Sequence, residues 1–391
     1  MSYLNKYYLS ALVVFALVSP ITYAGDTIKA IKKATSFKSE DGDFTIKFKG
    51  RVHADAAFYD DDITRMDDDT ELRRLRAGIT GTIMQDWIYS FHYDSESAVG
   101  YRIKGAYVGY KGFDNINIKI GNLQQPFSLE ELTSSNHILF MERSLANVFA
   151  PSYTLGSTVN AWGKRWSFTG GYFTDTLGDR HNDNEGGYSL ASRVTFNPID
   201  RRSFKIHLGA SAIFRNLDSG QTVSYSTRPE SRSTDARLLS TGTLKDVDKI
   251  KTYGLEAALI KGAWLLQGEV MQAKLDRKSH SDPVFEGAYV QAGWLITGEK
   301  HRYSGKNGTF KRVNPQSPYG ALELAVRYST LDLDDKTVTG GEEDNLSLGV
   351  NWYLNRNVRV MANYIQADAS PNRNGLNEDA NILQFRIQAY L

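Results

Sequence analysis

The chain has 391 residues, no cysteine, and nearly equal numbers of basic and acidic residues, 46 against 45. The absence of cysteine excludes a disulfide scaffold and thiolate metal sites. The balanced charge gives no support for nucleic-acid binding, so any electrostatic function must depend on where the charges lie.

The N-terminus has the features of a cleavable export signal. Lys6 supplies a positive start, residues 9–18 form an apolar stretch, and a small-residue cleavage site ends at Ala24. The apolar stretch is about ten residues long, which is too short for a helix that spans a membrane. We therefore expect residues 1–24 to be a signal peptide and the polar residues 25–43 to be a flexible periplasmic lead.

From residue 44 onward the sequence alternates apolar and polar residues with period two. In the first such segment Phe44, Ile46 and Phe48 share one face, and Lys49 and Arg51 share the other. The alternation lasts for about fifteen residues, whereas a soluble strand usually has about five or six. Strands that cross a membrane need about nine to eleven residues, with apolar side chains toward lipid and polar ones toward the lumen.

The same pattern recurs along the chain and predicts about 16 strands. Besides residues 44–58, we expect strands at 75–83, 87–94, 101–110, 115–121, 155–162, 165–174, 187–196, 204–214, 251–260, 263–274, 285–296, 320–331, 343–354, 356–366 and 380–391. The pattern is weakest over residues 215–250, where a further short strand could lie. The last segment runs to Leu391, as closure against the first strand requires, although outer-membrane barrels more often end in Phe or Trp.

These strands predict an all-β fold, a transmembrane antiparallel β-barrel over residues 44–391. In hydrocarbon every backbone polar group must be paired internally, and strands achieve this only by closing into a barrel. A soluble β-sandwich or propeller is the alternative, and it would need shorter strands and fewer charges on the polar face.

The segment from Gly121 to Pro151 interrupts the alternation. Its apolar residues recur mostly three, four or seven apart, as on short helical turns, and Pro126 and Pro151 bound it. A long insert of this kind in an all-β chain is usually functional or disordered, and its many large apolar residues argue against disorder. We expect residues 123–150 to fold back into the barrel and narrow it. An extracellular surface loop is the alternative.

The sequence contains no motif for catalysis or for a cofactor. There is no HExxH or GxSxG spacing and no Walker or dinucleotide loop. We therefore predict no enzymatic activity, no cofactor and no metal. The acidic runs Asp60–Asp62 and Asp67–Asp69 flank the first outer loop, where they could bind cations that bridge lipopolysaccharide or could be plain solvated loop.

Six segments carry a resemblance to a known family. They read RVHADAAFYDDD, ELRRLRAGITGT, IKGAYVGYKGF, QPFSLEELTSSNHILFMERSL, NVFAP and TGEKHRYSGKNGTFKRVNP. In these segments the chain resembles the phosphate-selective porin O and P family of Gram-negative outer membranes, over about residues 44–391 and most strongly through 44–156. The resemblance implies a 16-stranded homotrimeric barrel whose third loop folds inward. The segment from Gly121 to Pro151 follows the fifth expected strand, where that loop belongs.

The resemblance also implies an anion path. The arginine pair that ends the family's first extracellular loop matches Arg73 and Arg74. The paired serines of the constriction loop match Ser134 and Ser135, and the arginine after the Glu of that loop matches Arg143. The serine hydroxyls could donate to a dehydrating anion or could instead cap a helical turn within the loop.

Two positions depart from the family pattern. Phosphate-selective members carry a lysine three residues before the first serine, where this chain has Glu131. They also carry a ladder of alternating arginines at the entrance, of which YSTRPESRSTDARLL keeps only Arg228 in a strand-like position. Glu131 and the adjacent Glu130 could repel anions at the constriction, or could pair with arginines of the wall and hold the loop.

Arginines on the polar faces of the first strands support a preference for anions. Arg51, Arg74 and Arg76 are expected to point into the lumen, and guanidinium groups suit phosphate and carboxylate oxygens. The alternative is that these charges only balance acids on neighbouring strands.

We therefore expect an outer-membrane porin, a passive channel for small hydrophilic solutes. Small anions, with phosphate or polyphosphate among them, are the expected substrates, and lipid and lipopolysaccharide the surroundings. A general or mildly cation-preferring porin and a non-channel structural barrel remain as alternatives.

Overall fold

The computed structural model describes residues 35–95, 102–174, 187–201, 203–218 and 221–391. The expected signal peptide, residues 1–24, lies outside the described residues, as does most of the expected lead. Of that lead, Ser36–Lys38 (β1) pairs with the first barrel strand, with Phe37 opposite Ile46.

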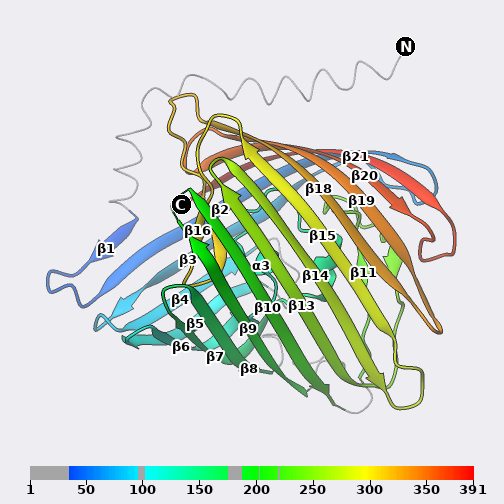
Figure 1. The fold of residues 1–391 in the computed structure, drawn as a ribbon, viewed down its shortest axis with the longest axis horizontal. Coiled ribbons are helices and arrows are strands. Elements are labelled where there is room, and N and C mark those ends of the chain that lie inside the picture. The colour runs from blue at the N-terminus through cyan, green and yellow to red at the C-terminus, as the bar shows by residue number, and fades with distance from the viewer. Residues whose placement is uncertain (1–34, 96–101, 175–186, 202, 219–220) are drawn as a thin grey trace.

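Sixteen long antiparallel strands of the described chain close into one barrel (Figure 1). They are β2 (Thr45–Asp61), β3 (Asp69–Ile83), β4 (Trp87–Asp94), β5 (Ile103–Phe113), β6 (Ile116–Gln124), β7 (Tyr153–Trp162), β8 (Trp166–Phe173), β9 (Gly187–Asp200), β10 (Phe204–Leu217), β13 (Val247–Lys261), β14 (Trp264–Arg277), β15 (Val284–Leu295), β18 (Ala321–Asp335), β19 (Val338–Tyr353), β20 (Val358–Ala369) and β21 (Glu378–Tyr390). Each pairs with the next one along the chain, and β21 returns to β2 with Ile387 opposite Ala54. The predicted barrel is confirmed, and each of the 16 predicted segments corresponds to one strand.

The two faces of the wall are inverted relative to a soluble protein. Large apolar side chains such as Ile120, Leu255 and Val270 are exposed on the outside, whereas Arg327 and Arg386 are fully buried inside. This inversion is what the alternation predicts when lipid covers the outer face and polar groups fill the lumen. Among the described residues, no helix is long and apolar enough to cross a membrane.

The constriction loop, residues 125–152, folds into the lumen. It contains two short helical turns, α3 (Leu129–Leu132) and η2 (Leu145–Phe149), as its apolar spacing predicts. The loop crosses to the far wall, where its Met141 N–H donates to the Asn363 side chain at 2.8 Å. The prediction of an inward loop is confirmed, and the alternative of an outer surface loop is wrong.

A second segment, the bracing loop (residues 221–246), also enters the lumen. The sequence left room here for a further short strand, and the structure has a small hairpin of β11 (Ser226–Thr227) and β12 (Leu239–Ser240), which pair with each other and not with the wall. Glu230 of this loop is buried and accepts the N–H of Leu145 at 3.1 Å, so the bracing loop holds η2 of the constriction loop.

A third segment reaches inward from the other end of the barrel. This inner turn, residues 296–320, carries β16 (Arg302–Ser304) and β17 (Thr309–Lys311). Its Phe310 N–H donates to the Thr133 hydroxyl at 3.3 Å, and Arg193 of the wall donates to the Gly308 carbonyl at 2.7 Å. The lumen is therefore narrowed by three chain segments, of which the sequence identified one.

Candidate functional site

A polar cavity of about 560 Å³ lies where the constriction loop faces β2, β3 and β5. Its lining includes eight of the nine predicted site residues, which are Arg51, Arg73, Arg74, Arg76, Glu131, Ser134, Ser135 and Arg143. The ninth, Arg228, is absent from the lining because its guanidinium pairs with Asp235 at 2.5 Å within the bracing loop. Arg232 of the same loop lines the cavity in its place. We call this space the basic cavity.

A β-bulge in β3 explains how adjacent arginines both reach the basic cavity. His53 of β2 lies opposite Arg74, but Asp55, two residues on, lies opposite Glu71, three residues back. The extra residue on β3 disrupts the alternation, as bulges do when they redirect a side chain. Arg73 therefore joins Arg74 on the lumen side, which strict alternation does not predict.

Positive charge dominates the lining of the basic cavity. Seven side chains are basic and two are carboxylates; the basic ones are Arg51, Arg73, Arg74, Arg76, Lys104, Arg143 and Arg232. The two carboxylates, Asp94 and Glu131, are both engaged by arginines. Arg76 meets Asp94 at 2.7 Å, and Arg143 meets Glu131 at 3.2 Å. The chain thus places an excess of cations around one cavity.

Arg51 is the arginine with the least neutralised charge in this lining. Its guanidinium donates to the Ser135 hydroxyl at 2.8 Å, and within the described residues no carboxylate lies at ion-pair distance from it. A hydroxyl that accepts one hydrogen bond keeps its own O–H to donate. Arg51 and Ser135 together offer a charged fork and a donor to an anion.

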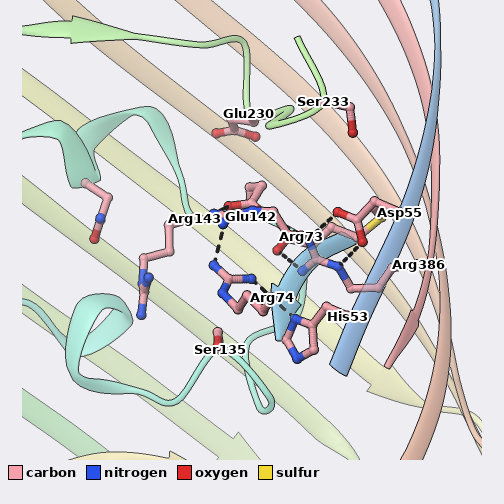
Figure 2. Close-up of polar contacts among 12 residues, drawn as sticks. His53, Asp55, Arg73, Arg74, Ser135, Glu142, Arg143, Glu230, Ser233 and Arg386 are labelled. Atoms are coloured by element: carbon pink, nitrogen blue, oxygen red, sulfur yellow. Dashed lines mark hydrogen bonds and ion pairs between the residues drawn. The ribbon is translucent and has the colours of Figure 1, made fainter. Parts of the chain in front are cut away.

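Behind the lining lies the carboxylate of Glu142, which is surrounded by two lining arginines, Arg73 and Arg74, and by Arg386 (Figure 2). Arg73 donates to both of its oxygens at 2.8 and 2.9 Å, Arg386 donates at 2.7 Å, and Arg74 lies 3.7 Å away. Burial alone would raise the pKa of Glu142, but the three guanidinium groups outweigh burial and hold it well below its ordinary value. Arg386 also binds Asp55 through two hydrogen bonds, so it joins β2 and β21 to the loop.

The two glutamates of α3 have different roles. Glu130 accepts hydrogen bonds from the backbone and hydroxyl of Ser144 at 3.0 and 2.9 Å and meets Arg327 of β18 at 3.5 Å. Glu130 therefore holds the constriction loop, which is one of the two roles that the sequence analysis left open. Glu131 lines the basic cavity, but Arg143 neutralises it locally.

Arg143, Ser134 and Ser135 line the basic cavity and also make contacts that stabilise the constriction loop. Arg143 donates to the carbonyls of Glu130 and Glu131 at 3.1 and 2.9 Å, so it orders the loop that it projects from. Ser134 accepts the backbone N–H of Asn136 at 3.4 Å, as in a side-chain turn, whereas Ser135 contacts Arg51.

The sequence did not single out three charged residues of the lining. Lys104 and Asp94 lie on the polar faces of expected strands, so the alternation contained a signal for them. Arg232 lies in the region without alternation and carried no such signal. Among the described residues, no cluster of His, Asp and Glu side chains suits a metal ion.

Comparisons with known proteins identify the family of this chain and agree with its barrel fold. Residues 46–391 match the phosphate-selective porin O and P family. An uncharacterized protein of Caulobacter vibrioides is 31% identical over 361 residues, covering 85% of this chain and 71% of that protein. Porin O of Pseudomonas aeruginosa is 27% identical over 421 residues, covering 94% of this chain and 93% of that protein. The trimer form of OmpT, an outer membrane protein of Vibrio cholerae, is similar in fold, with a TM-score of 0.59 at 13% identity over 89% of this chain and 99% of that chain.

Proposed function

We propose, from the premise that this chain belongs to the phosphate-selective porin O and P family, that its outer-membrane channel prefers anions. The observation that carries this proposal is the excess of basic side chains around the basic cavity, with both lining carboxylates paired. Rings of arginine and lysine favour anions in a pore, since field lines from several cations add in a narrow, low-dielectric space.

Phosphate is a candidate substrate with weak discrimination over other anions. Arg51 and Ser135 supply a guanidinium fork and a hydroxyl donor, which suit phosphate oxygens. Glu131 stands where phosphate-selective relatives carry lysine, so the basic cavity lacks one cation and keeps one carboxylate. Arg143 reduces the effect of that carboxylate on a passing anion but does not remove it.

Two other functions each have an observation in their favour. Glu131 and Asp94 at the constriction favour a general or mildly cation-preferring pore, although arginines pair with both. The three inward segments favour a structural barrel without a conducting path. The size of the basic cavity, about 560 Å³, argues for a path that hydrated ions can enter.

Planar-bilayer recording tests the proposal. We expect stepwise insertion, a reversal potential on the anion side in a potassium chloride gradient, and weak block of chloride current by phosphate. A reversal potential on the cation side would refute anion preference, and insertion without conductance steps would favour the structural barrel.

We also propose that the barrel assembles as a homotrimer in the outer membrane, in contact with lipid and lipopolysaccharide. The family resemblance and the trimer form of OmpT support this assembly. Mild-detergent electrophoresis of unheated protein should give one band at three times the chain mass, and a monomer band in every detergent would contradict it.

A further inference from the structure

A second cavity of about 380 Å³ opens beside the basic cavity. The two share Ala150 and Ser152 of the constriction loop, so they adjoin each other. The second cavity lies between η2, the bracing loop and the wall strands β9, β10 and β13. We call it the aromatic pocket, because its lining differs in kind from the charged lining next to it.

Apolar side chains form one side of the aromatic pocket. Phe149 and Tyr225 meet edge to face with ring centroids 5.4 Å apart, and Tyr225 packs in the same way against Phe285 at 5.7 Å. Ile213 and Ile250 of the wall add aliphatic surface. Phe149, Ile213 and Ile250 are largely buried in a core cluster, so the half-buried Val148, Val223 and Tyr225 supply most of the accessible apolar surface of the pocket. The lumen of a porin barrel is ordinarily polar, so accessible apolar surface there is unexpected and indicates a ligand with an apolar part.

The polar side of the pocket carries Arg215 of β10. Within the described residues its guanidinium has no hydrogen-bond or ion-pair partner, whereas other lumen arginines such as Arg193 and Arg327 each bind a carboxylate. The phenol of Tyr225 likewise has no partner there. Burial raises the pKa of Tyr225 to about 12, so the phenol stays neutral and can donate its proton in a hydrogen bond.

We propose that the aromatic pocket binds small aromatic carboxylates. The carboxylate lies at Arg215, which can donate two parallel hydrogen bonds to it, and the ring packs against Phe149 and Tyr225. A pocket of this size is at the lower end of the range for small-molecule sites and holds a benzoate-sized ion with water. Inorganic anions gain nothing from the apolar side, so the pocket would select among anions by their apolar part. The inference rests on the proposed function only in that anions must enter this lumen.

Block of chloride current by benzoate, compared with acetate, tests the proposal. Both are monovalent carboxylates, and only benzoate has a ring. Covering about half of a phenyl ring removes roughly 60 to 100 Å² of apolar surface from water. We therefore expect benzoate to reach half-block at a concentration at least about tenfold lower than acetate. Equal half-blocking concentrations would overturn the proposal.

Two variants locate the effect. Arg215→Gln removes the charge and should weaken benzoate block about tenfold, whereas Arg165→Gln, at an exposed turn at the opposite end of the barrel, removes an equal charge outside the pocket. Phe149→Leu keeps an apolar side chain without the ring and should weaken benzoate block several-fold more than acetate block. If Arg215→Gln behaves like Arg165→Gln, or if Phe149→Leu leaves the ratio of benzoate to acetate block unchanged, the site is wrong.

The same recordings separate this inference from the proposed function. The reversal potential in potassium chloride reports anion preference without any aromatic solute. A channel that prefers anions but blocks equally with benzoate and acetate contradicts only the aromatic pocket. A channel without anion preference that still shows the benzoate effect at Arg215 contradicts only the proposed function.

Discussion

Arginines on two sides of the same lumen perform different tasks. On the β2–β3 side, Arg51 and Arg76 face the basic cavity. On the β18–β21 side, Arg327, Arg359 and Arg386 are fully buried and donate to carbonyls of the constriction loop. A position facing the lumen therefore does not decide the role of an arginine. The role depends on the partner of the arginine. A buried arginine bonded to loop carbonyls fixes the conformation of the constriction loop, whereas an arginine at the basic cavity sets the electrostatic potential there.

The difference follows from where the constriction loop lies. The loop packs its apolar residues against β13 to β18, and its backbone accepts hydrogen bonds from arginines of β18, β20 and β21. Polar groups on that side must therefore be satisfied by hydrogen bonds within the protein. On the β2–β3 side the loop leaves the basic cavity open, so arginines on that side are available to solutes. One insert thereby divides the lumen into an anchoring side and a conducting side.

The largest effect is expected from Arg327→Met, which removes an anchor. Arg327 is the partner of both Glu130 and Glu230, and its loss leaves two buried carboxylates without their cation. Breaking a buried pair in this way costs about 3–5 kcal/mol. We expect a lower temperature of heat modification on electrophoresis and noisier channels of larger conductance.

The matched control for that variant is Arg65→Met. Arg65 pairs with Asp67 in an exposed loop, where such a pair contributes little. Arg327→Met with the heat stability and current noise of Arg65→Met would contradict the anchoring role.

A smaller effect is expected from Glu131→Lys, on the conducting side. The change moves the basic cavity by two charges and restores the residue that the family resemblance implies. At about 8 Å with an effective dielectric near 20, each charge changes the energy of a monovalent anion by roughly 2 kcal/mol before screening. Salt reduces this figure, yet about 1.4 kcal/mol still changes occupancy tenfold. We expect stronger phosphate block in Glu131→Lys, with Glu131→Gln between it and the original protein. Any other order would show that Glu131 does not act through its charge.

A one-charge change gives the sharpest test of the two sides. Arg51→Gln should shift the reversal potential toward zero with little change in heat stability, because the Arg51 guanidinium lines the basic cavity and, within the described residues, bonds only to Ser135. Arg359→Gln removes a buried arginine bonded to the Ile138 carbonyl and to Gln388. It should lower heat stability and leave the reversal potential near its original value. If both variants change the same property, the two sides do not differ as described.

The sequence alone predicts the barrel and its strands because lipid and water impose one simple period on the wall. Ile120 and Leu255 point outward for the same reason that Gln384 and Arg386 point inward. The constriction loop is equally predictable, since Gly121–Pro151 breaks that period.

Other parts of the site depend on pairings that no local pattern contains. The bulge that turns Arg73 inward is a mismatch between two strands, and it is visible only once His53 and Arg74 are opposite each other. Glu230 holds the constriction loop from 85 residues away, and nothing around it in the sequence marks it. Arg228 and Arg232 are four residues apart in a non-strand loop, so strand geometry pointed to the wrong one.

The last and smallest expected effect is the change of heat stability with pH that Glu142 causes. The charge of Glu142 joins the two sides through Arg73 and Arg386. Because the pKa of Glu142 is lower in the folded protein than the ordinary value of 4.5, its pairing stabilises the fold fully above that value. The contribution falls as the pH drops from 4.5 toward the lowered pKa, because only the unfolded chain binds the proton in that range, and it is fully lost once the folded protein is protonated too. We expect heat stability to be level from pH 7 to 5 and to fall below about pH 4.

Glu142→Gln carries the uncharged form at every pH and tests this directly. It should be less stable than the original protein at pH 7 and should lose less stability on acidification, by up to about 1.4 kcal/mol per pH unit for one proton. Glu40→Gln, at an exposed position outside the barrel, should keep the original profile. Heat modification measured from pH 3 to 7 compares the three proteins. A Glu142→Gln profile parallel to the original would mean that the three arginines do not depend on this charge, and that the conducting and anchoring sides are joined by other contacts.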